Sequence, residues 1–204
     1  MRAFTFKQGS VRCPDGLSLL HVYALGDVAR GTGLAALMAS CRQATATEPL
    51  AHIGDPWLHV TLCQVRVPPA EIDDEQRAAL VDAIGRASAA VTPFTITVTE
   101  PARVATGVIC PIADGPLGPL RRLVSDAARS VLGEQAVSGD SGLLHMSESY
   151  AYGDADDARI DEGLRAVRPR QATVPVDAVH LVDMLGDQAA RTISWVPVAR
   201  IPLG

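Results

Sequence analysis

The sequence predicts an α+β fold made of two similar lobes within one domain. A chain of 204 residues with 48 % apolar residues can bury a substantial hydrophobic core. Segments with the periodicity of strands alternate with amphipathic segments typical of helices. The second half of the chain repeats the element order of the first half at an offset of 86 residues. Together these three features indicate a pseudo-twofold molecule.

The first repeat covers roughly residues 19–100 and contains three predicted strands and two predicted helices. Alternating or β-branched apolar runs predict strands at 19–26, 58–67 and 94–100. Apolar residues at helical spacing predict helices at 28–46 and 71–90. The segment before Ser18 is polar, and CPDG at 13–16 predicts a turn.

The second repeat covers roughly residues 103–186 and follows the same order. Strands are predicted at 103–112, 143–153 and 174–185, and a last strand at 192–203 closes the chain. Helices are predicted at 116–132, between Pro116 and Gly133, and at 154–168. Because no proline- and glycine-rich linker separates the repeats, we expect one domain, residues 1–204.

Equivalent positions in the two repeats carry similar residues. The offset of 86 relates His59 to His145 and Thr61 to Ser147. It also relates five pairs of apolar residues: Val22 and Val108, Leu34 and Leu120, Leu37 and Leu123, Val81 and Val167, and Ile96 and Val182. One register therefore superposes a His-x-Thr strand of the first repeat on a His-x-Ser strand of the second.

Charge and cysteine content limit the partners that the chain is expected to have. The net charge of −5 excludes the basic surface that holds long nucleic acids through many phosphate contacts. The four cysteines, Cys13, Cys41, Cys63 and Cys110, form neither a CxxC pair nor a metal-ligand spacing. We therefore expect reduced thiols and a cytoplasmic protein. No stretch has the about 20 apolar residues that cross a bilayer, so no membrane partner is expected. The sequence also gives no sign of an obligate protein partner.

The two polar tripeptides are the candidate site. Side chains alternate along a strand, so His59 and Thr61 project to one face, and His145 and Ser147 do the same on their own strand. The apolar residues between and beside them, Leu58, Val60 and Leu62 in the first repeat, point into the core. If the lobes face each other, two imidazoles and two hydroxyls share a groove.

This set of side chains suits a phosphodiester substrate. Displacement at phosphorus needs a base on one side and an acid on the other, and imidazole serves as either near neutral pH. Hydroxyl groups can donate hydrogen bonds to the non-bridging oxygens, where negative charge is held. Neither tripeptide is accompanied by an Asp/Glu cluster or a third close histidine, so no metal site is expected.

The paired motifs "HVT" and "HMS" resemble those of the two-histidine (2H) phosphoesterase superfamily. "PWLHVTLCQV" is similar to the first motif of its 2′-5′ RNA ligase-like, or RNA 2′,3′-cyclic phosphodiesterase, branch. The resemblance implies a bilobal fold of two antiparallel sheets with flanking helices around a central cleft. It also implies opening of a 2′,3′-cyclic phosphate to a 2′-phosphate without metal or cofactor, with reverse joining to a 2′-5′ linkage in some members.

By motif position, the resemblance makes His59 and His145 the acid/base pair and Thr61 and Ser147 the phosphate-oxygen donors. Which histidine is the acid stays open. The implied partners are RNA ends or small nucleotides that carry a cyclic phosphate. Candidate substrate contacts are Tyr23, Ser149 and Tyr150, of which Ser149 extends the polar row of its strand, as Cys63 does on the first.

Glu148 departs from the pattern, because it lies where a buried apolar residue is expected. Either the strand is exposed at this point, or Glu148 pairs with a cation such as an arginine. The departure keeps a second interpretation open, in which the same cleft binds a nucleotide or RNA end without turnover.

Overall fold

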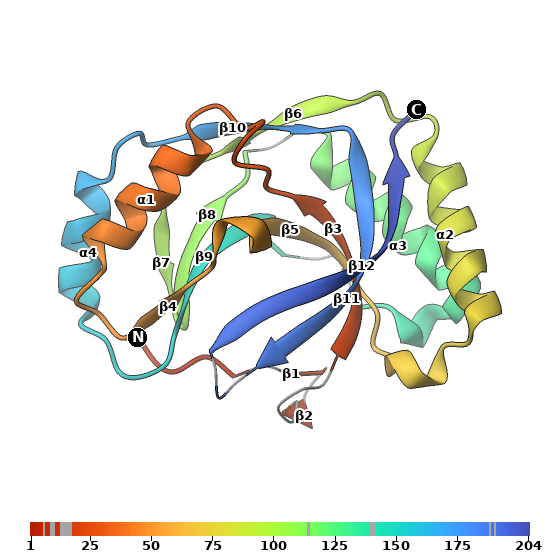
Figure 1. Cartoon of the computed structure of the whole chain (residues 1–204), viewed down its shortest axis with the longest axis horizontal. Coiled ribbons are helices and arrows are strands. Elements are labelled where there is room, and N and C mark those ends of the chain that lie inside the picture. The colour runs from red at the N-terminus through yellow and green to blue at the C-terminus, as the bar shows by residue number, and fades with distance from the viewer. Residues whose placement is uncertain are drawn as a thin grey trace.

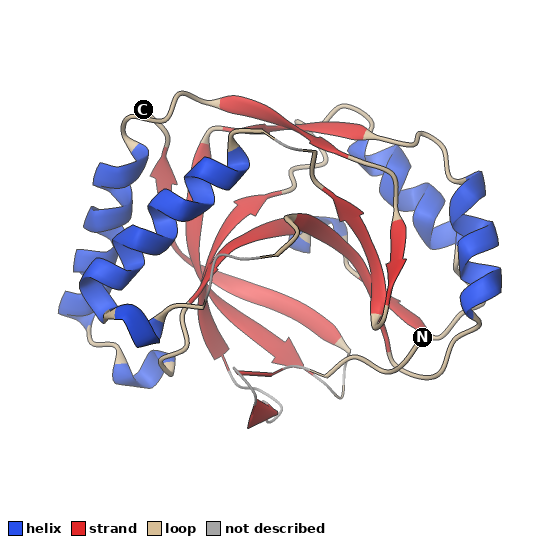
Figure 2. Cartoon of the chain, turned by 180° about the vertical axis from the view of Figure 1, so that it is seen from behind, coloured by secondary structure: helices blue, strands red, loops and turns tan. Residues whose placement is uncertain are grey.

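The computed structural model describes residues 1–5, 7–8, 11–12, 18–113, 115–138, 142–187, 189 and 191–204. The predicted CPDG turn and Cys13 lie outside these ranges. Two pairs of helices lie at opposite ends of the molecule, with curved sheets between them (Figures 1 and 2). Within the described ranges, no helix is both long enough and apolar enough to cross a membrane.

Eight of the described strands form the central layer, and every pairing among them is antiparallel. What we call the first sheet contains β12 (Thr192–Pro202), β11 (Ala178–Asp187), β3 (Ser18–Leu25) and β5 (His59–Gln64), in that order. The second sheet contains β9 (His145–Ala151), β8 (Gly107–Pro111) and β7 (Ala102–Val104), with β4 (Leu50–His52) paired to β9. In the described ranges a single residue pair, Val60 opposite Met146, joins the two sheets. The predicted α+β fold with two antiparallel sheets is confirmed.

Two smaller pairs of strands complete the β-structure. Strands β6 (Phe94–Val98) and β10 (Ala172–Val176) pair antiparallel, and β1 (Lys7–Gln8) pairs with β2 (Val11–Arg12). The predicted strand at 103–112 is in fact the hairpin of β7 and β8, with a turn at 105–106. Gly107 permits this hairpin, because a Cβ there would lie 2.1 Å from the Ser149 carbonyl oxygen.

Each helix pair takes one helix from each repeat. Helix α1 (Leu34–Ala44) packs on α4 (Asp157–Ala166) beside β7 and β10, and α2 (Asp74–Ser88) packs on α3 (Leu117–Leu132) beside β12 and β5. The predicted apolar face of α1 is buried, through Leu34, Leu37, Met38 and Cys41. Helix α1 begins later than predicted, because Gly33 has a φ of 78° and Thr32 forms a bridge with Thr173.

The offset of 86 residues holds for the strands that carry the tripeptides and fails further along the chain. It superposes β5 on β9 and α1 on α3, although Leu37 is buried and its equivalent Leu123 is 41 % exposed. Ile96 and Val182, expected to correspond, lie in different sheets. Ile96 instead pairs with Val174 at the centre of the β6–β10 pair. The offset falls to 83 at the starts of α2 and α4, and to 78 at the starts of β6 and β10, because α4 has 10 residues where α2 has 15.

The contact between α1 and α4 depends on a glycine. A Cβ at Gly163 in α4 would lie 2.5 Å from the Ala44 carbonyl oxygen, whereas a Cβ at Gly85 in α2 would meet only Ile201, at 3.9 Å. We expect Gly163→Ala to lower the free energy of unfolding by about 1–3 kcal/mol through overpacking. Gly85→Ala is the matched control and should raise it by up to about 1 kcal/mol. Urea denaturation measures both, and equal effects would contradict this packing.

Candidate active site

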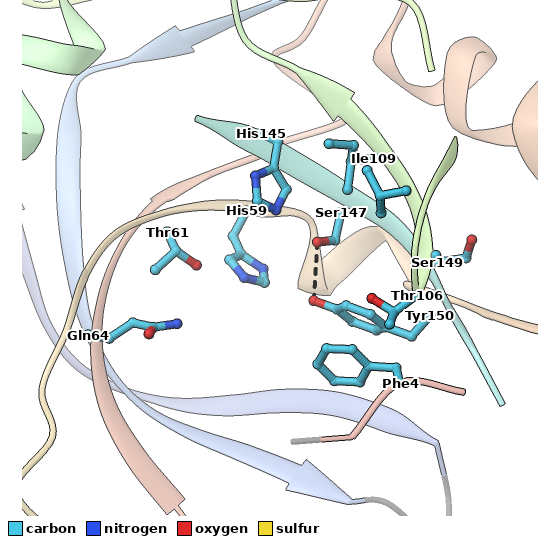
Figure 3. Close-up of a pocket in the computed structure, with 12 residues that line it drawn as sticks. Phe4, His59, Thr61, Gln64, Thr106, Ile109, His145, Ser147, Ser149 and Tyr150 are labelled. Carbon is cyan, nitrogen blue, oxygen red and sulfur yellow. Dashed lines mark hydrogen bonds between the residues drawn. The ribbon is translucent and has the colours of Figure 1, made fainter. Parts of the chain in front are cut away.

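All four side chains of the two tripeptides line one cavity of about 390 Å³ between the two sheets (Figure 3). His59 and Thr61 come from β5, and His145 and Ser147 come from β9. The apolar residues that alternate with His59 and Thr61 are buried, as the pattern predicts: Leu58 just before β5, and Val60 and Leu62 within it. Tertiary structure therefore brings together residues that are 86 positions apart.

A β-bulge interrupts each of the two strands at the same place in the repeat. The pairing of β5 with β3 leaves Leu62 as the extra residue, and the pairing of β9 with β8 leaves Glu148. A bulge shifts the alternation of side chains beyond it. Gln64 and Tyr150, which are also 86 residues apart, therefore line the cavity, whereas Cys63 does not.

Both histidines are held in the same way. The Nδ1 of His59 lies 2.8 Å from the Trp57 carbonyl oxygen, and the Nδ1 of His145 lies 2.8 Å from the Leu143 carbonyl oxygen. A carbonyl oxygen only accepts hydrogen bonds, so each Nδ1 donates and carries the proton of the neutral ring. Each Nε2 is left as the atom that can exchange a proton with a ligand.

The surroundings of His59 keep its imidazole neutral. The ring stacks on Tyr23 at 3.9 Å between centroids, and Trp195 meets it edge-on at 5.1 Å. Burial lowers the pKa of His59 to about 4; the hydrogen bond to the Trp57 carbonyl raises it in part, and charge on His145 lowers it further. His59 is therefore an uncharged proton acceptor near pH 7, whereas the His145 side chain is more exposed.

Tyr23 does not reach the cavity, contrary to its expected role as a substrate contact. Its side chain is fully buried behind His59, because β3 lies next to β5 on the side away from β9. The Tyr23 hydroxyl lies 2.7 Å from Nδ1 of His21, whose pKa burial lowers to about 3. Tyr23 thus packs against His59 and does not line the cavity.

The other two candidate contacts do line the cavity. Ser149 is buried, and its hydroxyl has no hydrogen-bond partner among the described residues. Tyr150 places its hydroxyl 3.1 Å from the Ser147 Oγ, and its ring stacks on Phe4 at 4.2 Å (Figure 3). The wall of the cavity also includes residues that sequence patterns did not single out: Phe4, Gln64, Val104, Thr106, Gly107 and Ile109.

Only one of these additional residues carries a signal in the sequence. Gln64 lies 86 residues before Tyr150, so the repeat could have identified it once Tyr150 was a candidate. Phe4 reaches the cavity through the pairing of its backbone NH with the Ala151 carbonyl, at 2.7 Å. Thr106 reaches it through the β7–β8 turn. No local pattern encodes either contact.

Glu148 is not exposed, and its partner among the described residues is a basic side chain, a histidine in place of an arginine. Its side chain is 1 % exposed and accepts a hydrogen bond at 2.9 Å from Nδ1 of His52, which lies on the neighbouring strand β4. It does not line the cavity, so the departure from the apolar pattern leaves the second half of the site intact. In the part of the chain that is described, no three His, Cys, Asp or Glu side chains are grouped to hold a metal ion.

Solved structures share this architecture at low sequence identity. The protein TT0787 of Thermus thermophilus superposes with a TM-score of 0.68 at 14 % identity, covering 91 % of this chain and 97 % of that one. E. coli LigT complexed with 3′-AMP gives a TM-score of 0.62 at 17 % identity, covering 92 % and 98 %. A comparison with curated proteins found no match.

A family model gives the assignment. The model of the 2′-5′ RNA ligase superfamily matches residues 31–188, which include both tripeptides, helices α1 to α4 and strands β4 to β11. The family is the one that the "HVT" and "HMS" motifs resemble. The chain belongs to the 2′-5′ RNA ligase superfamily of two-histidine phosphoesterases.

Proposed function

We propose that this protein opens 2′,3′-cyclic phosphates of RNA ends or nucleotides to 2′-phosphates by paired-histidine acid/base catalysis. Membership of the superfamily supports a phosphoesterase or ligase activity. The observation that carries the specific proposal is the cavity in which two imidazoles of the same tautomer face two hydroxyls. The same geometry supports 2′-5′ joining, in which the 5′-hydroxyl of a second RNA end attacks the cyclic phosphate in place of water and the 3′ oxygen leaves.

The two histidines take different roles in this mechanism. His59 is neutral, so its Nε2 accepts a proton from the attacking water as the new P–O bond forms. The P–O3′ bond breaks on the opposite side of the phosphorus, and the departing 3′ oxygen takes a proton from Nε2 of protonated His145. We assign the acid role to His145 because the other imidazole is held uncharged.

The hydroxyls and the size of the cavity support a nucleotide substrate. Thr61 and Ser147 line the cavity. In this mechanism their hydroxyls donate hydrogen bonds to the non-bridging phosphate oxygens. A cavity of about 390 Å³ lies within the range of about 300–1,000 Å³ typical of small-ligand sites. The structurally similar LigT has been crystallised with 3′-AMP. The thiols of Cys41 and Cys110 are buried and not in a disulfide, which supports a cytoplasmic location.

Non-catalytic binding has lost its main support. Glu148 was the feature of the sequence that favoured it, and Glu148 contacts His52 away from the cavity. Binding without turnover is therefore an outcome of the experiment below and not a second proposal.

The activity test uses a 2′,3′-cyclic nucleotide and an RNA oligomer with a cyclic phosphate end, both in EDTA. The wild type should produce 2′-phosphates, and His59→Ala and His145→Ala should each lose about 10²–10⁴-fold in kcat, because each removes one proton-transfer group. His180→Ala is the matched control, because His180 lies on β11 of the first sheet and does not line the cavity. Binding of the oligomer without turnover, or activity that survives both substitutions, would contradict the proposal.

The pH dependence of kcat/KM tests the assignment of the base. Protonation of His59 removes the acceptor, so activity should fall as the pH drops through about 4, the pKa that burial gives His59. An unperturbed histidine would place this decline near pH 6.5. The His180→Ala variant should give the same acid limb as the wild type. An acid limb between pH 6 and 7 would show that His59 is not the base in the free enzyme.

A further inference from the structure

The hydroxyls of Tyr150 and Ser147 meet inside the cavity, at 3.1 Å (Figure 3). The two residues are three positions apart on β9, and regular alternation would place their side chains on opposite faces. The bulge at Glu148 inserts one residue and returns Tyr150 to the face of Ser147. The contact is therefore built into the backbone of the strand that carries His145.

The Tyr150 ring is held from its other side by the N-terminal segment. Phe4 stacks on it with 4.2 Å between the ring centroids and 27° between the ring planes. The backbone NH of Phe4 donates to the carbonyl oxygen of Ala151, the residue after Tyr150, at 2.7 Å. Stacking and backbone pairing together restrict where the phenol hydroxyl can point.

The hydrogen bond runs from Tyr150 to Ser147. A phenol is a stronger donor than an aliphatic hydroxyl, and burial raises the pKa of Tyr150, so it keeps its proton across the working pH range. The Ser147 oxygen uses a lone pair to accept this bond. Its own single proton is then directed away from the tyrosine and is available to a ligand in the cavity.

The first half of the site has no such arrangement. The position equivalent to Tyr150 is Gln64, which lines the cavity from β5. Within the described part of the chain, no hydrogen bond joins Gln64 to Thr61. The Thr61 hydroxyl is therefore free to rotate where the Ser147 hydroxyl is constrained.

From this asymmetry we infer that Tyr150 is a positioning residue that holds the Ser147 hydroxyl as a fixed hydrogen-bond donor to one non-bridging phosphate oxygen. The inference rests on the proposed phosphoesterase function. It adds that the two non-bridging phosphate oxygens meet donors of different rigidity. One oxygen meets a preorganised donor, and the other meets a donor that must be ordered in each turnover. The enzyme should therefore discriminate between the two diastereomers of a 2′,3′-cyclic phosphorothioate.

The first experiment removes the Tyr150 hydroxyl alone. Tyr150→Phe should lower kcat and kcat/KM together by about fivefold to tenfold. This is the effect expected when the hydrogen bond from Ser147 to the phosphate oxygen in the transition state is weakened. Tyr152→Phe is the matched control, because Tyr152 is 41 % exposed and contacts Arg191 outside the cavity. It should leave both constants unchanged. Thermal melting of each variant verifies that it is folded.

A double-mutant cycle then tests whether Tyr150 acts through Ser147. In a Ser147→Ala background, Tyr150→Phe should have almost no further effect, because the group that it positions is gone. The phosphorothioate preference offers a second readout, which a purely structural role would not change selectively. The ratio of kcat/KM for the two diastereomers should move in Tyr150→Phe toward the ratio of Ser147→Ala, and stay at the wild-type value in Tyr152→Phe.

The possible results separate this inference from the proposed function. A wild type without turnover would overturn the function itself. With turnover established, the inference is overturned by an unchanged rate and diastereomer ratio in Tyr150→Phe. It is also overturned by a loss that is fully additive with Ser147→Ala, which would mean that Tyr150 contacts the substrate independently. If Ser147→Ala is too slow for the cycle to be measured, the ratio of kcat/KM for the two diastereomers decides the inference. A ratio in Tyr150→Phe equal to that of the wild type would overturn it.

Discussion

The site depends on one backbone junction, the pairing of Val60 on β5 with Met146 on β9. Both residues are fully buried, and each directly follows the histidine of its tripeptide. Because this pair alone, among the described residues, joins the two sheets, β5 and β9 belong to separate lobes on either side of it. The junction therefore brings His59 and His145 to one cavity, while each strand stays anchored in its own sheet.

The two histidines are held by the same backbone geometry but lie in different surroundings. Both histidines donate through Nδ1 to the carbonyl two residues earlier, so each presents Nε2 in the same way. Their surroundings differ, because Tyr23 and Trp195 enclose only His59 and burial makes its charged form unfavourable. In the proposed mechanism, this difference assigns the base to His59 and the acid to His145.

The two repeats are not independent folding units, since each end of the molecule combines one helix from each repeat. Helix α1 comes from the first repeat but packs on α4 of the second, and α2 packs on α3 in the same reciprocal way. A buried contact between the thiols of Cys41 in α1 and Cys110 in β8 follows from this exchange, and together with burial it raises the pKa of Cys110. Both repeats thus contribute to a single hydrophobic core.

The sequence by itself determined the buried face of α1, through periodicity within one helix. It also determined the fold class and the paired His-x-Thr/Ser motifs, through the order of the elements and the offset of 86 residues. Only the tertiary structure decided that Gln64 replaces Cys63 in the cavity, that Tyr23 lies behind His59, and that His52 is the partner of Glu148. The bulges at Leu62 and Glu148 arise from the register of each strand against its neighbour. Register between strands is set by packing among residues distant in the chain, which no local pattern encodes.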